Sequence, residues 1–182
     1  MGKRKTLKQI LEPIKNLIDD VHNCEATLDK RFPHTRLSYV RSVFAMIEGT
    51  IHCVKELEFA EAYKHGKASI PEFVALKERI VEIKNNGNIR ESDKFVPTVN
   101  NLRFMSRMFR KIFGKELGLE IGTTSWENFK NAVKIRNRIT HPKGWGDIDL
   151  TEEELETIKS VNVWFNSIIE QIFQTVGKFY QS

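Results

Sequence analysis

Apolar residues recur at helical spacing through nearly the whole of the 182-residue chain, and this pattern constrains the fold most strongly. The clearest stripe consists of Leu37, Val40, Phe44, Ile47, Ile51 and Val54. We find no strand of normal length with alternating apolar and polar residues. The sequence therefore predicts an all-α fold.

Breaks between these stripes divide the chain into six expected helices. They lie at about residues 7–28, 37–64, 71–84, 98–113, 124–140 and 152–179. Gly66 and Gly114 are the expected terminators of the second and fourth helices. Capping boxes at Thr124–Glu127 and Thr151–Glu154 are expected to open the last two.

The third helix is expected to begin at Pro71, because proline is favoured in the first turn. Ile80 and Ile83 continue its apolar stripe, and the Asn-Asn-Gly sequence at 85–87 is expected to stop it. Residues 88–97 are polar and irregular, and we expect them to form an exposed connection. The simplest arrangement is an antiparallel bundle of four main helices with additional short helices, forming one domain over residues 1–182.

Composition narrows the setting in which the chain works. It has no run of eighteen apolar residues, so we expect no membrane span. Cys24 and Cys53 make no disulfide framework, and we expect free thiols in a reducing cytoplasm. The net charge of +5 indicates a modest preference for polyanions.

Arg136 falls on the apolar side of the expected fifth helix. On a helical wheel of residues 126–141, apolar side chains fill about one half, and Arg136 lies near its middle. A guanidinium is always charged, so an inward position is costly unless an anion meets it. The anion can be a carboxylate of this chain, a neighbouring subunit or a ligand phosphate. Glu48 is our first candidate for the chain without a ligand.

His141 stands just before Pro142, and proline disfavours the α conformation in the residue that precedes it. We expect the helix to end at about Thr140, which frees His141 to converge with Arg136 on one ligand. A histidine beside a fixed cation is a minimal apparatus for cleaving a phosphodiester. Spacing alone also allows another interpretation, in which basic residues favour the last helical turns and His141 caps exposed carbonyls.

Residues 136–141, Arg-Asn-Arg-Ile-Thr-His, resemble the signature of the HEPN superfamily. In that signature an arginine and a polar residue, often asparagine, precede three variable positions and a histidine. HEPN domains are small helical bundles in which the motif ends a late helix and a long helix follows, as expected here. Residues 39–58 also resemble the long early helix of such domains.

The resemblance implies a metal-independent endoribonuclease without a cofactor. In the family, two protomers pair so that both motifs line one cleft, and the 2′-hydroxyl of the RNA attacks to leave a 2′,3′-cyclic phosphate. Arg136 would bind the phosphate, His141 would be the general acid or base, and Asn137 would orient one of them. Many relatives are toxins or antiviral effectors, so the implied partners are RNA, a second copy and an antitoxin or other regulatory protein.

We expect further substrate contacts around the motif and on two other helices. These residues are Arg138, Lys143, Glu48, Arg41, Arg103 and Arg107. Glu48 can instead form a local pair with His52, and the basic strip of the fourth helix can instead be a solvated face. For the whole chain, the alternatives are a non-catalytic HEPN-like module that binds a protein partner or nucleotide and, last, a basic DNA-binding helical protein.

Overall fold

The computed structural model of the chain describes residues 7–29 and 32–181, and most of these residues are helical. The helices are α1 (Leu7–Ala26), α2 (Pro33–His65), α3 (Ile70–Leu76), α4 (Thr98–Phe113), α5 (Thr124–Thr140), the short 3-10 helix η1 (Trp145–Ile148) and α6 (Glu152–Gln181). Two short strands, β1 (Arg79–Ile83) and β2 (Ile89–Asp93), lie between α3 and α4. The prediction of a largely helical fold is therefore confirmed.

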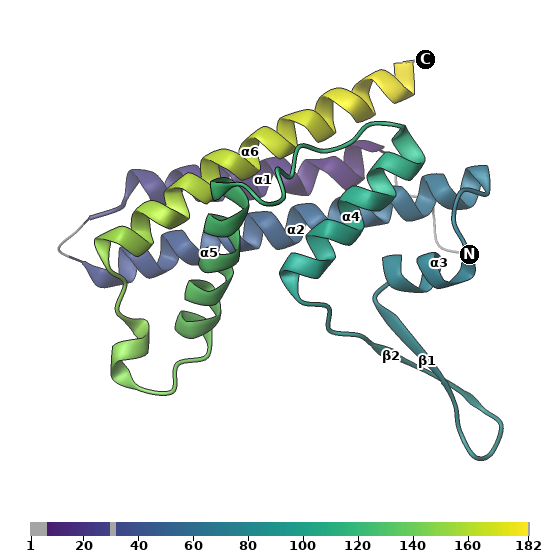
Figure 1. Cartoon of the computed structure of the whole chain (residues 1–182), viewed down its shortest axis with the longest axis horizontal. Coiled ribbons are helices and arrows are strands. Elements are labelled where there is room, and N and C mark those ends of the chain that lie inside the picture. The colour runs from purple at the N-terminus through teal and green to yellow at the C-terminus, as the bar shows by residue number, and fades with distance from the viewer. Residues whose placement is uncertain (1–6, 30–31, 182) are drawn as a thin grey trace.

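Helix α2 is the centre of the arrangement, because it contacts each of the other α-helices. Figure 1 shows α1, α2 and α6 lying along the long axis, with α4 and α5 crossing them. One hydrophobic core joins α1, α2, α4, α5 and α6. Its fully buried aromatic side chains include Tyr39, Phe109, Phe129 and Phe165. This arrangement brings one side of α5 against the middle of α2.

Several predicted helix ends are confirmed. Gly66 and Gly114 terminate α2 and α4 in the left-handed conformation, with φ of 63° and 72°. The capping box of α6 is present, since Thr151 N–H donates to Glu154 Oε2 (3.1 Å) and Glu154 N–H donates to Thr151 Oγ1 (3.2 Å). The box predicted at Thr124 is wrong. Thr123 occupies the N-cap of α5, because Thr124 is already within the helix.

The predicted third helix is wrong beyond Leu76, and so is the expectation that the chain has no strand. Residues 79–83 and 89–93 pair as an antiparallel hairpin in which Ile83 lies opposite Ile89. The β-branched residues of 79–83 favour an extended backbone, and Gly87, with φ of 79°, turns the chain. Ile80 and Ile83 fit both a helical stripe and a strand. The turn at residues 85–87 favours the strand, because it lets the chain reverse into a hairpin.

The hairpin projects from the helices, as Figure 1 shows at the lower right. All five residues of β1 are exposed, so the strand is not covered by the core. The connection expected at residues 88–97 is mostly exposed, but the expectation that it is irregular is wrong in part, because it contains β2. In the described part of the chain, no helix combines the length and the apolarity needed to cross a membrane. Cys24 and Cys53 are not joined in a disulfide.

Candidate functional site

Arg136 turns inward from α5 onto α2, as its position on the apolar side predicts. Its side chain is 19 % exposed, and its Nη2 forms an ion pair with Glu48 Oε1. The guanidinium also lies 5.5 Å from the centre of the Phe44 ring. The predicted pairing of Arg136 with Glu48 is therefore confirmed. This carboxylate is the anion that makes the inward position tolerable.

Two further hydrogen bonds hold this ion pair. Thr98 Oγ1, at the start of α4, donates to Glu48 Oε1 (3.0 Å), and Arg136 Nη1 donates to Asn137 Oδ1 (3.0 Å). Burial lowers the pKa of Arg136 from its ordinary value, while the adjacent carboxylate of Glu48 favours the charged guanidinium. The Glu48 side chain is 40 % exposed, so a ligand anion can reach this position and take the place of the carboxylate.

The Arg136–Glu48 pair borders a pocket of about 240 Å³. Its walls come from α2, α4, α5 and the base of the hairpin, and its polar lining includes Glu48, His52, Glu78, Asn101 and Arg136. A volume of this size holds a phosphate with part of a sugar and is too small for a large ligand. We refer to it below as the Arg136 pocket.

A buried lysine binds two of the residues that line the Arg136 pocket. The Lys55 side chain is 2 % exposed, and its Nζ donates to Glu78 Oε1 (2.7 Å) and Asn101 Oδ1 (2.8 Å). Asn101 Nδ2 also donates to Glu78 Oε1 (2.9 Å). Burial opposes the charge on Glu78, but hydrogen bonds from Lys55 and Asn101 outweigh it and lower the pKa of this carboxyl. This part of the lining is therefore fixed by one ion pair and two hydrogen bonds of Asn101.

This network was missed from the sequence, although one signal was present. Lys55 stands four positions after Ile51 of the apolar stripe, and it is thus a cation facing the core in the same way as Arg136. Its partner Glu78 lies in the segment that was predicted to be helical. A helix through residues 71–84 does not predict that Glu78 contacts Lys55 of α2.

His141 lies where α5 ends, and the predicted end at Thr140 is confirmed. Its backbone has φ of −126° and ψ of 61°, and its N–H donates to Asn137 O (3.0 Å). The side chain is exposed and is not among the described residues that line the Arg136 pocket. Within one chain, the structure therefore does not bring His141 and Arg136 together in this pocket. Their convergence on one phosphate stays a prediction.

Arg138, two residues after Arg136, faces the connection between α5 and α6. It donates to the carbonyls of Asp147 (2.9 Å) and Asp149 (2.8 Å) and to both carboxylate oxygens of Glu154 (2.7 and 2.8 Å). The Asp147 carboxylate in turn accepts the backbone N–H of Lys143 (2.7 Å). Arg138 thus fastens the segment that follows His141. The predicted contacts of Arg138 and Lys143 with RNA remain predictions.

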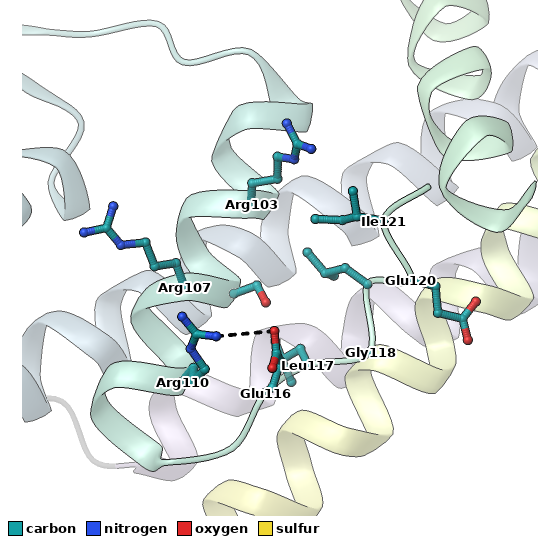
Figure 2. Close-up of a pocket in the computed structure, with 10 residues that line it drawn as sticks. Arg103, Arg107, Arg110, Glu116, Leu117, Gly118, Glu120 and Ile121 are labelled. Carbon is teal, nitrogen blue, oxygen red and sulfur yellow. Dashed lines mark ion pairs between the residues drawn. The ribbon is translucent and has the colours of Figure 1, made fainter. Parts of the chain in front are cut away.

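Arg103 and Arg107 line a second pocket, of about 570 Å³, together with Arg110. Figure 2 shows these arginines on α4, with residues 116–121 on the opposite side. Arg103 lies over the Trp126 ring at 5.3 Å, while the ion pairs of Arg107 and Arg110 with glutamates are long, at 3.5 and 3.6 Å. Exposed pairs of this kind are weak and exchange easily for a ligand anion. Arg41, also predicted to bind substrate, is exposed on α2.

Comparison with known proteins gave no match, because no protein-family model, no curated protein and no solved structure is significantly similar to this chain. The features of the chain that bear on its function are the motif at residues 136–141 and the two pockets described above.

Proposed function

We propose that the chain is a metal-independent endoribonuclease of the HEPN type, working in the cytoplasm as a toxin or antiviral defence effector. On this proposal residues 1–182 form one domain with the four-helix arrangement of that family. The observation that carries the proposal is the inward Arg136, held at a solvent-accessible pocket by a carboxylate that a ligand can replace. A half-buried arginine whose counter-ion a ligand can replace suits a phosphate, because a guanidinium can donate two parallel charge-assisted hydrogen bonds to it.

In the proposed reaction an RNA phosphate takes the place of Glu48 on Arg136. The 2′-hydroxyl of the preceding ribose attacks phosphorus, the bond to the 5′ oxygen breaks, and the products are a 2′,3′-cyclic phosphate and a 5′-hydroxyl. The Arg136 guanidinium stabilises the charge that develops on the non-bridging oxygens. His141 transfers a proton as general acid or base, and Asn137 orients Arg136 through their hydrogen bond.

We further propose that the active form is a homodimer. His141 is exposed at the end of α5, outside the Arg136 pocket of its own chain. A second copy can complete the site by placing its motif beside the first. An antitoxin or another regulatory protein that covers His141 or prevents pairing would then hold the enzyme inactive.

A cleavage assay tests this proposal. The purified protein is incubated with a mixed single-stranded RNA in EDTA, beside Arg136→Ala and His141→Ala. Each variant is expected to cut about 100- to 1000-fold more slowly, as for loss of one group that stabilises the transition state. The matched control is Lys134→Ala, which removes an exposed cation from the same helix and should leave the rate unchanged.

Three results would count against the enzyme. Equal rates for the parent and both site variants would show that Arg136 and His141 do not carry the chemistry. Loss of cutting in EDTA would contradict the metal-independent mechanism. Products that end in an open 3′-phosphate from the first turnover, without a cyclic intermediate, would contradict attack by the 2′-hydroxyl.

The second candidate is a non-catalytic HEPN-like module that binds a nucleotide. The larger pocket of α4 favours it, because that pocket offers three arginines beside apolar residues of 117–121. Induced expression in bacteria separates the two candidates. Growth arrest that disappears in His141→Ala favours the nuclease, whereas normal growth together with nucleotide binding to the pure protein favours the module.

A further inference from the structure

A second histidine, His52, lines the Arg136 pocket. It lies on α2 and is exposed, and it borders both this pocket and the neighbouring cavity at the base of the hairpin. The structure therefore gives the arginine a histidine neighbour within one chain, and that neighbour is not His141. In the cleavage mechanism above, His52 has no role.

The helix geometry of α2 fixes how His52 stands relative to the arginine. His52 follows Glu48 by four residues, which places their Cβ atoms roughly 6 Å apart on one side of the helix. Glu48 is the residue that the Arg136 guanidinium holds directly. A phosphate that replaces the Glu48 carboxylate on Arg136 therefore enters the same pocket that His52 lines.

Another part of the pocket lining limits where the phosphate can go. Lys55, Glu78 and Asn101 are locked to one another by hydrogen bonds of 2.7 to 2.9 Å. The Glu78 carboxylate lines the pocket together with His52, and its negative charge repels a phosphate. A phosphate in the pocket is thereby directed away from Glu78 and towards Arg136.

We propose that Arg136 and His52 of the same chain bind the phosphate together and that His52 is a catalytic residue of the nuclease reaction, an inference that rests on the proposed function. Neutral His52 takes the proton of the 2′-hydroxyl as the bond from O2′ to phosphorus forms. Protonated His141 of a second copy gives a proton to O5′ as the bond from phosphorus to O5′ breaks. The attacking O2′ and the leaving O5′ lie on opposite sides of phosphorus. His52 inside the pocket therefore acts on O2′, and His141 of the second copy, outside the pocket, acts on O5′.

Charged groups from four parts of the fold line the two cavities that His52 borders. From α2 they are Glu48 and Glu56. From the segment after α3 they are Lys77 and Glu78, and from the hairpin and the residue after it they are Arg79, Asp93 and Lys94. From α5 the group is Arg136. Because both signs are present, a pH measurement has to be made on the intact chain.

Binding is tested first, without cleavage. Histidine ring resonances are followed by NMR as uridine 3′-monophosphate, a product-like phosphate, is added to the full chain, with His52→Gln used to assign the His52 signal. The His52 signal is expected to shift in the parent and to stay in place in Arg136→Ala, while exposed His22 of α1 serves as the internal control. An unshifted His52 in the parent overturns the inference whatever the cleavage assay gives.

Cleavage is tested second. His52→Gln keeps a polar side chain but cannot take a proton, so we expect a 100- to 10,000-fold lower rate and loss of the rise in rate with pH on the acid side of the profile. His22→Ala is expected to cleave like the parent. Normal cleavage by His52→Gln overturns the catalytic role while the proposed function stands. If the parent binds the nucleotide at His52 but cuts no RNA, the proposed function and the catalytic role of His52 are both wrong. The phosphate site shared by Arg136 and His52 then still stands.

Discussion

Arg136 and Arg138 stand two positions apart on α5 and have opposite surroundings. Arg136 has one carboxylate partner, Glu48, whose side chain is 40 % exposed beside a pocket. Arg138 makes four hydrogen bonds, to two backbone carbonyls and to both oxygens of Glu154. A ligand can replace a single exposed carboxylate, whereas it cannot reproduce a set of fixed carbonyls. The first arginine is therefore suited to binding and the second to holding structure.

Arg138 acts on the segment that carries His141. This segment leads from α5 to the first turn of α6, and a second arginine, Arg36 of α2, also binds it by donating to Leu150 O (3.2 Å) and pairing with Glu152. The position of His141 relative to the helices is thus set by two arginines that do not line the Arg136 pocket. An arginine thus lines the candidate site in one place, and arginines stabilise the segment that positions His141 in another.

The largest expected effect that separates the two arginines is on stability. Arg138→Ala should lower the free energy of unfolding by about 2 to 3 kcal/mol, because it removes four hydrogen bonds, two to backbone carbonyls and two to Glu154. Arg136→Ala should lower it by less than about 1 kcal/mol, because the exposed Glu48 can be solvated instead. Urea unfolding followed by circular dichroism measures both.

Arg138→Lys is the control for charge in this comparison. A lysine keeps the positive charge but cannot donate to four acceptors in the planar pattern of a guanidinium, so most of the stability loss should remain. Equal stabilities for Arg136→Ala and Arg138→Ala would contradict the division of roles drawn above.

A smaller effect is expected on phosphate affinity. Glu48→Gln removes the charge that competes for Arg136 but keeps an oxygen for the Thr98 hydroxyl, so uridine 3′-monophosphate should bind about three- to fivefold more tightly. Glu154→Gln removes the matching carboxylate from Arg138 and should not raise the affinity. Calorimetric titration of both variants checks this. Unchanged or weaker binding by Glu48→Gln would show that the carboxylate does not occupy the phosphate position.

The two arginines also show what the sequence could predict. The inward position of Arg136 follows from the helical wheel, and the end of α5 follows from Pro142, because both are local rules. The partners of Arg138 depend on how residues 141–151 return to α6, and that path is set by tertiary contacts. The charge pattern of the motif alone therefore does not distinguish the binding arginine from the structural one.

The hairpin was missed for a different physical reason. Ile80 and Ile83 are three residues apart, a spacing that satisfies a helix, and their β-branched side chains also suit a strand. The Asn-Gly turn at 86–87 was interpreted as a helix stop instead of a hairpin turn. The network of Lys55, Glu78 and Asn101 could not be predicted without the hairpin, because its central carboxylate, Glu78, lies at the hairpin base.

The smallest effect on stability is expected at the tip of the hairpin. This hairpin connects α3 to α4, as the His141 segment connects α5 to α6. Ile83 and Ile89 at the hairpin tip are 79 % and 70 % exposed, so Ile83→Ser with Ile89→Ser removes little buried surface. The free energy of unfolding should change by less than about 0.5 kcal/mol per substitution. The control Ile51→Ala, at a position 1 % exposed, should cost about 2 to 5 kcal/mol. A loss above about 1 kcal/mol per tip substitution that grows with protein concentration would show that another copy covers the tip. The hairpin would then be stabilised by a second molecule, whereas the His141 segment is stabilised by arginines of its own chain.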